Sequence, residues 1–372
     1  MPRLGHDKSE ENVAERKWHL ISMDTNTVNP ISSTAPYDYL RIERYLTTFV
    51  DAQALKLGLA NGLIEYIVAD PGAELETIAR VTGTDVEGSL LLLRLLAANG
   101  VVARSHNRFS LTPHFAASLP YRELIELKIE YADMVMADLK EHFGLYVGRF
   151  DLFMRDSRTF DLFTYQRCYT MSEENYAITS SWMRFTTAVT KFEALVCMER
   201  HDFSGYKTLL DIGGNSGEFA LQLCKRQPHM YANVFDLPVV CAVGEKHVQD
   251  HPEADRIRFI SGDALVDPIP GTFDAVSFKS FLHDWPEEAV ADYIARAYEL
   301  LTDNGTCIIF ERGPLDLEKG TPSYAMIPVM LFHRNFRTPD FYLATLKKVG
   351  FRHTSLQEFD LETPFYIIIG QK

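Results

Sequence analysis

The chain has 372 residues and a formal net charge of -14, with 37 lysines and arginines against 51 aspartates and glutamates. This length is enough for two or three domains, each able to bury its own hydrophobic core. The acidic balance argues against a nucleic-acid partner and against an anionic membrane surface, because both require a basic face.

The cysteines are few and scattered, and none forms a CxxC pair, so a thiolate zinc site is not expected. Such a set indicates buried free thiols in a reducing compartment. The N-terminal segment lacks the pattern of a signal peptide, and no apolar run is long enough to span a bilayer. We therefore expect a cytoplasmic protein. The cysteines are Cys168, Cys197, Cys224, Cys241 and Cys307.

The first third of the chain predicts an arm and a small helical domain. Residues 1–35 are polar and poorly periodic, which is typical of a flexible arm. Residues 36–117 begin with apolar residues at helical spacing from Tyr37 to about Val68, read as one long helix. A short helix is predicted over 75–83.

A leucine-rich helix follows, with Asp85 as its predicted N-cap and Asn99-Gly100 as its end. Two short strands, 101–104 and 108–111, then form a winged-helix pattern, for which DNA binding is one interpretation. The helix that would enter a DNA groove has only Arg94 as a basic residue. A helix that is apolar on most faces is buried, so dimerisation is the better hypothesis.

Residues 118–200 are helical and rich in aromatic side chains, which suit either a core or the lining of a pocket for a planar substrate. From residue 201 to 372 strands and helices alternate, which predicts a parallel sheet with helices on both faces. The tail from Arg352 holds two apolar runs that predict a closing hairpin. The other strands are expected near 207–212, 231–235, 257–260, 273–279 and 305–311.

A glycine-rich turn follows the first of these strands, in the stretch from Leu209 to Glu218. Glycine permits positive φ and lets a ligand approach the backbone closely. Asp236 ends the second strand, where an acid can hydrogen-bond a ribose diol, and Asp263 follows the third. No Gly-Lys-Ser/Thr motif is present. The pattern therefore indicates an adenosine ligand without a triphosphate.

These residues resemble class I S-adenosylmethionine-dependent methyltransferases, and more narrowly the small-molecule O-methyltransferase family that includes caffeic acid and hydroxyindole O-methyltransferases. Two further segments carry the resemblance: Phe278 to Trp285, with its His-Asp-Trp, and Asn304 to Glu311, a strand that ends in an acid. The resemblance covers roughly residues 36–372.

The resemblance implies an α/β fold, with a seven-stranded Rossmann-like catalytic domain over 201–372. It is preceded by a helical linker and substrate-pocket region over 118–200 and a winged-helix dimerisation domain over 36–117. It also implies a homodimer, S-adenosylmethionine as methyl donor with S-adenosylhomocysteine as product, and a small-molecule acceptor. The implied donor site comprises Asp211, Gly213, Gly214, Gly217, Asp236, Leu237, Asp263, Ala264 and Lys279.

His283 is the best general base for removing the acceptor's proton. An unperturbed imidazole titrates near pH 6.5, and this residue comes just after a strand whose carboxyl end faces ligands in open α/β sheets. In the family that the chain resembles, the acid at Glu311 orients this ring. The resemblance also places Phe163 and Met171 against the substrate, and we add Asp284 and His333 as substrate contacts.

Three residues depart from the family pattern. Asn215 replaces the middle glycine of the turn, a mild change because asparagine tolerates the left-handed region. Ser280 replaces an aromatic residue, which should loosen packing near the adenine. Phe336 stands where the family often has a second acid beside the catalytic histidine.

The loss of that acid keeps other hypotheses open. His283 and His333 could together hold a metal that acts as a Lewis acid for C-methylation of a 2-oxo acid. C- or N-methylation without a metal is a third hypothesis. A protein that binds the donor without methylating is the last. O-methylation with His283 as base and no metal is the prediction that we favour.

Overall fold

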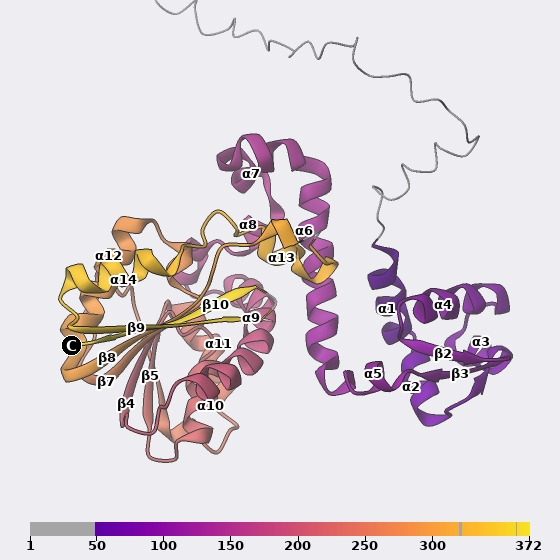
Figure 1. Cartoon of the computed structure of the whole chain (residues 1–372), viewed down its shortest axis with the longest axis horizontal. Helices are drawn as coiled ribbons and strands as arrows, with labels where there is room; N and C mark the ends of the chain where they lie inside the picture. Colours follow the sequence, from indigo (N-terminus) through magenta and orange to yellow (C-terminus); the bar gives the residue numbers. More distant parts are fainter. Residues whose placement is uncertain (1–48, 320–321, 362) are drawn as a thin grey trace, which may run out of the picture. The chain divides into compact units, whose positions relative to one another are not determined.

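The computed structural model describes residues 49–319, 322–361 and 363–372 (Figure 1). The predicted arm over residues 1–35 and the first part of the predicted helix from Tyr37 lie outside the described residues. Within the described residues no helix is long and apolar enough to cross a membrane. All five cysteines are buried free thiols, as the sequence predicts.

The predicted long helix is in fact two helices in its described part, α1 (Val50–Ala60) and α2 (Leu63–Ala69). The reason is Gly62, which adopts the left-handed conformation with φ of 78° and breaks the α-helical path. The side chain of Asn61 reinforces the break, because its Oδ1 accepts a hydrogen bond from Leu63 N at 3.2 Å. Apolar spacing alone did not reveal this turn.

The rest of this region agrees with the sequence. The helices α3 (Leu75–Thr82) and α4 (Val86–Ala98) follow, and the Asp85 carboxylate caps α4 by accepting from Gly88 N at 2.7 Å. The predicted hairpin is confirmed, because two strands pair antiparallel and a third short strand joins their edge. These strands are β1 (Ala73–Glu74), β2 (Val102–Ser105) and β3 (Arg108–Leu111).

The C-terminal half contains a seven-stranded sheet of order β6-β5-β4-β7-β8-β10-β9. The strand β10 runs antiparallel to both of its neighbours, β8 and β9. The consecutive strands β9 and β10 form the predicted hairpin. The predicted Rossmann-like α/β fold with seven strands is therefore confirmed. The strands are β4 (Thr208–Ile212), β5 (Tyr231–Asp236), β6 (Ile257–Ser261), β7 (Phe273–Lys279), β8 (Leu301–Arg312), β9 (His353–Asp360) and β10 (Pro364–Gln371).

Helices cover both faces of the sheet (Figure 1), which explains why its central strands are apolar on both sides. One face packs on α12 (Glu287–Leu300) and α14 (Pro339–Val349). The other packs on α9 (Glu173–Arg200) and α10 (Glu218–Arg226). α11 (Pro238–Val248) lies against α9 and β6.

The aromatic-rich region before the sheet is helical, as predicted. Its first long helix, α6, contacts α9 and the short α13 that follows β8 in the chain. This arrangement brings together side chains from α6 and α13, which are far apart in the sequence. The helices are α5 (Pro113–Ala116), α6 (Arg122–Gly148), α7 (Phe150–Asp156), α8 (Arg158–Leu162) and α13 (Ile327–Met330).

Candidate active site

A cavity of about 380 Å³ lies at the carboxyl ends of β4, β5, β7 and β8. This is the edge at which open α/β sheets bind their ligands. Its wall has two parts. One consists of the glycine-rich turn and the acids that end the strands, and the other consists of aromatic side chains from the helical region.

The glycines of the turn are required by close packing. A Cβ on Gly213 would lie 2.1 Å from Phe281 Cδ2, and a Cβ on Gly214 would lie 2.7 Å from Asp211 Oδ2. Gly213 also has a φ of 69°. Gly217, with a φ of 73°, packs against Phe259 and starts α10 rather than lining the cavity. Only glycine allows the backbone of this turn to approach so closely.

Asn215 takes the left-handed conformation in this turn, with a φ of 55°. Its backbone N–H donates to Asp236 Oδ2 at 2.8 Å. Its side-chain Oδ1 accepts from Ser216 N at 2.8 Å and from Thr186 Oγ1 of α9 at 3.2 Å. The departure from glycine is therefore accommodated, and it ties the turn to α9.

The three predicted acids all line the cavity, but their surroundings differ. Asp211 is buried, and burial raises its pKa to about 7 even though Ser277 donates to it at 2.6 Å. Burial also raises the pKa of Asp236, to about 6, against the backbone N–H groups that it accepts. Asp263 accepts a hydrogen bond from the Tyr169 hydroxyl at 2.8 Å. Leu237 and Ala264, the neighbours of two of these acids, also line the cavity.

Lys279 lines the cavity beside the turn, but Ser280 does not leave the expected gap. Ser280 has a φ of 48°, and its hydroxyl accepts a hydrogen bond from Arg312 Nη1 at 3.2 Å. The ring of Phe281 packs directly on Gly213 instead. An aromatic ring therefore lies beside the turn, supplied by the residue after Ser280.

His283 and Glu311 form a buried pair, with Nδ1 of the ring 2.8 Å from Glu311 Oε2. The other oxygen of Glu311 accepts from the backbone N–H of Phe281 at 2.8 Å and of Leu282 at 2.7 Å. These donors and His283 hold the pKa of Glu311 below its ordinary value although burial opposes them. An ionised carboxylate only accepts, so Nδ1 is the protonated nitrogen of the neutral ring and Nε2 is its free acceptor.

The other side of His283 has a different partner from the one that the family pattern suggests. The ring of Phe336 lies 5.3 Å from the imidazole, centroid to centroid, and supplies no acid. Asp284 Oδ1, however, lies 3.5 Å from Nε2. The Tyr165 hydroxyl fixes this carboxylate by donating to its Oδ2 at 2.6 Å. Burial lowers the pKa of His283, but the charges of Glu311 and Asp284 outweigh it and leave the pKa raised.

His333, which the sequence suggests as a substrate contact, does not join this centre. It is absent from the wall of the cavity, and its Nδ1 lies 3.0 Å from the Tyr146 hydroxyl and 3.1 Å from the Met330 carbonyl oxygen. Among the described residues no group of three or more His, Cys, Asp or Glu side chains is placed to hold a metal. The two-histidine metal hypothesis therefore has no ligand set in this part of the chain.

The aromatic part of the cavity contains Phe163, as predicted, but not Met171. Met171 precedes the N-cap of α9 and is 54% exposed, so in this chain it lies outside the cavity wall and its contact with the substrate stays a prediction. Most of this wall has no local signature in the sequence, because its residues are scattered over α6, α8, α9 and the segments that follow α8 and α13, and only their aromatic abundance gives a signal. The wall includes Tyr131, Phe160, Phe163, Tyr165, Trp182, Phe185, Phe332 and Phe336.

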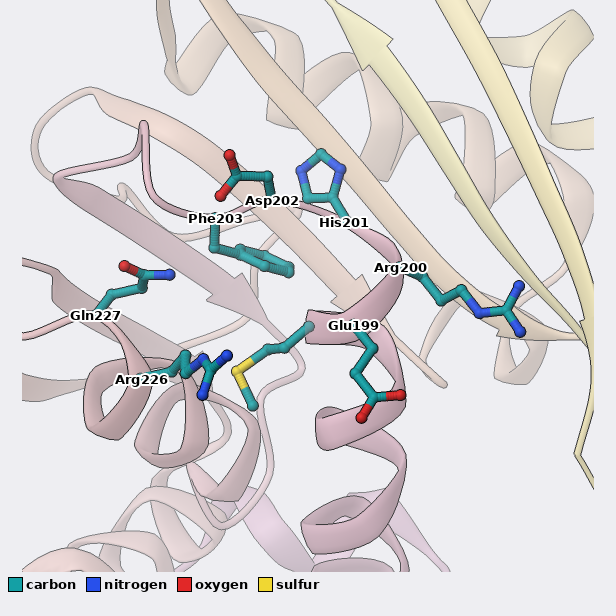
Figure 2. Close-up of a pocket in the computed structure, with 8 residues that line it drawn as sticks. Glu199, Arg200, His201, Asp202, Phe203, Arg226 and Gln227 are labelled. Atoms are coloured by element: carbon teal, nitrogen blue, oxygen red, sulfur yellow. The ribbon is translucent and has the colours of Figure 1, made fainter.

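A second hollow lies at the opposite edge of the sheet (Figure 2). It is formed by the end of α9 and the residues that follow α10, just before β4 and β5 begin, and it is lined by charged and polar side chains such as Arg200 and Asp202. Ligands of such sheets bind at the other edge. We therefore assign the active site to the first cavity.

A glycine-rich turn with strand-end acids on this seven-stranded sheet defines a class I S-adenosylmethionine-dependent methyltransferase. The comparisons agree: the sequence model of the O-methyltransferase domain family matches residues 152–352. The chain belongs to this family of small-molecule methyltransferases, as the sequence motifs predict.

Two relatives and one structure show how far the similarity extends. The chain is 27% identical over 339 residues to 3-amino-4-hydroxybenzoate 4-O-methyltransferase from Streptomyces cremeus, covering 87% of this chain and 88% of that one. It is 29% identical over 189 residues to the N,N-dimethyltransferase OxyT from Streptomyces rimosus, covering 49% of this chain and 54% of that one. The structure of human N-acetylserotonin methyltransferase in complex with SAM superposes with a TM-score of 0.68 at 19% identity, covering 91% and 99% of the two chains.

Proposed function

We propose that this protein transfers the methyl group of S-adenosylmethionine to a hydroxyl group of a small aromatic molecule, with His283 as general base. The observation that carries the proposal is the pairing of His283 Nδ1 with the ionised Glu311 at 2.8 Å, which leaves Nε2 as a proton acceptor at the cavity wall. The S. cremeus relative, whose name describes a 4-O-methyltransferase of a hydroxybenzoate, supports the same chemistry.

The residues of the turn fit the donor. The backbone of Gly213 and Gly214 leaves room that any Cβ would fill, and Asp236 lies where a ribose diol needs an acceptor. Asp211 Oδ2 is buried and has no hydrogen-bond partner among the described residues. It could therefore accept a hydrogen bond from a ligand. When bound, the donor would supply a methyl group on a sulfonium.

The chain's own residues would handle the acceptor's proton. A phenol has a pKa near 10, so a base helps at neutral pH. His283 Nε2 would take the proton, and the resulting imidazolium would lie between Glu311 at 2.8 Å and Asp284 at 3.5 Å. Two carboxylates around one cation favour the charged ring. Tyr165 would keep Asp284 in place through its 2.6 Å hydrogen bond.

The aromatic wall supports a planar acceptor. Phe163 contacts the rings of Trp182 and Phe332, with centroid distances of 5.5 and 6.0 Å, and Phe332 lies 6.4 Å from the His283 ring. These rings line the cavity, and an aromatic wall of this kind suits another flat ring. His283 lines the same cavity, so a flat acceptor bound there would present a ring substituent to Nε2.

An amine acceptor is the second candidate, because the OxyT relative is named as an N,N-dimethyltransferase. An amine with a free lone pair needs less help from a base than a phenol does. Substitution of His283 therefore separates the two: it should strongly impair methylation of a phenol and only weakly impair methylation of an aniline of the same ring.

We also propose a homodimer formed through the predicted dimerisation domain, residues 36–117, in a cytoplasmic protein. Leu91 of α4 is 61% exposed and Leu57 of α1 is 49% exposed, while their neighbours form the domain's core. Apolar side chains of this size favour burial against a partner. Light scattering should give about twice the chain mass of 42.4 kDa at micromolar concentration, and the single-chain mass would contradict the proposal.

Calorimetry with S-adenosylhomocysteine tests the donor half of the proposal. Binding at micromolar level, roughly -8 kcal/mol, is the expected result. A protein that bound neither S-adenosylhomocysteine nor S-adenosylmethionine would overturn the proposed function.

A further inference from the structure

Lys128 of α6 lines the cavity from the aromatic part of its wall. Three residues of this helix, Lys128, Tyr131 and Val135, line the cavity, and their spacing of i, i+3 and i+7 places them on one helix face. The ring of Tyr131 stacks on Phe185 at 4.3 Å and lies 6.1 Å from the ring of Phe163. Lys128 therefore shares a helix face with the aromatic wall and brings a positive charge to it.

This lysine has no partner in the part of the chain that the structure describes. Among the described residues it makes no hydrogen bond and no ion pair, whereas Lys279, the other lysine of the cavity wall, lies 2.5 Å from Glu193 Oε2. Residues three and four positions away are its neighbours on the helix surface, and none of them is an acid. These neighbours are Leu124, Ile125, Tyr131 and Ala132.

The acids of α6 that lie nearest in the sequence face elsewhere. Glu126 accepts a hydrogen bond from Arg122 Nε at 2.8 Å. Asp133 accepts from Gln53 Nε2 at 2.6 Å and pairs with Lys56. Glu130 is exposed and only two positions away, a spacing that does not bring two helical side chains together. The charge of Lys128 is therefore available to a ligand.

A half-buried lysine beside aromatic rings makes a bound ligand's charge matter. Its stem packs along apolar surface while water solvates the ammonium group. A flat neutral ligand would displace some of that water and leave the charge without a partner, which costs free energy. A ligand with a carboxylate would replace the water with a hydrogen bond between two charged groups, and such bonds are among the strong ones.

We propose that Lys128 is a specificity residue that selects acceptors with a carboxylate group on the aromatic ring system, in addition to the hydroxyl that is methylated. The inference rests on the proposed function, because it takes an aromatic acceptor as a ligand of this cavity, and it narrows the acceptor to an aromatic hydroxy acid. The carboxylate contacts the ammonium group of Lys128 while the hydroxyl faces His283 Nε2. The methyl donor also has a carboxylate, so the experiment separates the two sources.

The test compares acceptors that differ only in this charge. 4-Hydroxybenzoate, 4-hydroxycinnamate and 6-hydroxy-2-naphthoate hold the carboxylate at different distances from the hydroxyl. Each of them and its primary amide are titrated by calorimetry into protein saturated with S-adenosylhomocysteine. At least one carboxylate should bind the wild type about tenfold more tightly than its amide, because a hydrogen bond between charged groups forms. Lys128→Met should abolish this preference, and Lys128→Arg, which keeps the charge, should retain most of it.

Lys140→Met is the matched control. Lys140 lies on the same helix, but it is exposed and outside the cavity wall. Its substitution removes the same charge from α6 and should leave the preference unchanged. Methionine has a helix propensity close to that of lysine, so both variants should keep the fold. Titration of S-adenosylhomocysteine checks this, and its affinity should be the same in the wild type and in both variants.

Three results would overturn the inference while the proposed function stands. The first is a wild type that binds no carboxylate of the panel more tightly than its amide. The second is a preference that persists in Lys128→Met or that Lys140→Met abolishes equally. The third is a loss of affinity for S-adenosylhomocysteine in Lys128→Met, which would assign the lysine to the carboxylate of the donor. A wild type that binds no adenosyl ligand would overturn the proposed function, and the inference with it.

Discussion

The two parts of the cavity wall are built in different ways. The donor part uses the backbone of one turn and single acids at the ends of strands that follow one another in the chain. These strands are also neighbours in the sheet, so the acids lie close together. The acceptor part uses side chains from α6, α8 and α9 and from the segment after β8, which are far apart in sequence. The donor part is therefore fixed by the fold of the sheet. The acceptor part depends on how the helices pack, and it can change without disturbing the sheet.

His283 stands where the two parts meet, and its substitution should have the largest effect. His283→Ala should lower the rate of methylation of a phenol about 10²–10⁴-fold, because the base is lost. Donor affinity should persist, since Nε2 belongs to the acceptor side. The measurement is single-turnover kinetics together with calorimetry of S-adenosylhomocysteine.

His333→Gln is the control for this substitution, because His333 bonds Tyr146 and Met330 outside the cavity. It should leave the rate nearly unchanged, and a chelator should have no effect. Equal losses from His283→Ala and His333→Gln, reversed by added metal, would instead revive the metal hypothesis.

The pH profile should distinguish the two carboxylates beside His283. The raised pKa of His283 means that the ring is protonated, and useless as a base, up to a pH above its ordinary value of 6.5. The acid limb of kcat should therefore lie above pH 6.5. Glu311→Gln removes a charge that raises this pKa, so the limb should move to lower pH while kcat falls about tenfold or more, because the ring loses its orientation.

An unchanged acid limb in Glu311→Gln would show that another group controls the profile. Asp284→Asn should shift the limb in the same direction but less, because its oxygen is 3.5 Å from the ring instead of 2.8 Å.

On the donor side, Asp236→Ala should weaken S-adenosylhomocysteine binding by at least about 1 kcal/mol, because the ribose loses a charged acceptor. The pKa of Asp236, raised to about 6 by burial, adds a pH dependence. Protonation of the carboxyl as the pH falls through 6 removes an acceptor, so wild-type affinity should decline from pH 7 to pH 5. Asp236→Asn should show a weaker decline, and an equal decline in both proteins would contradict this role.

On the acceptor side, Phe163→Ala should raise the KM for the aromatic acceptor by about two- to tenfold and leave donor affinity unchanged, because a ring contact of about 0.5–1.5 kcal/mol is lost. Phe160→Ala is a matched variant, because that ring contacts Phe332 at 5.7 Å and also lines the cavity, and it should likewise leave donor affinity unchanged. Loss of donor binding in Phe163→Ala would contradict the proposal that the two parts of the wall bind different ligands.

The smallest effect is expected at the turn. Asn215→Gly relieves the backbone strain of a φ of 55°, but it removes the side-chain oxygen that accepts hydrogen bonds from Ser216 and Thr186. These effects oppose each other, so donor affinity should change by no more than about threefold, or roughly 0.6 kcal/mol. A larger loss in calorimetry would mean that the link from the turn to α9 matters more than the strain.

The two parts also differ in how far the sequence predicts them. The sheet, the turn and the acids follow from local patterns: Gly213, Asp236 and Asp263 each end or follow a strand, and parallel strands bring their carboxyl ends together. His283 and Glu311, whose side chains contact each other, each lie inside a recognisable motif.

Contacts between distant segments are the part that the sequence does not predict. The Tyr165 hydroxyl holds Asp284 across 119 positions, and Glu193 meets Arg312 across another 119, so no local pattern marks either contact. His333 was linked to His283 by residue type alone, and Tyr146, 187 positions earlier, binds it instead. Met171 came from a motif position whose side chain this chain exposes to solvent.

Transfer of a labelled methyl group tests the central claim most directly. Protein, S-adenosylmethionine with a deuterated methyl group and a panel of planar phenols are incubated, and the products are analysed by mass spectrometry and by NMR. The wild type should form a product with the labelled methyl on oxygen, and His283→Ala should not. A product labelled on carbon or nitrogen, or a phenol methylated equally well without His283, would contradict it.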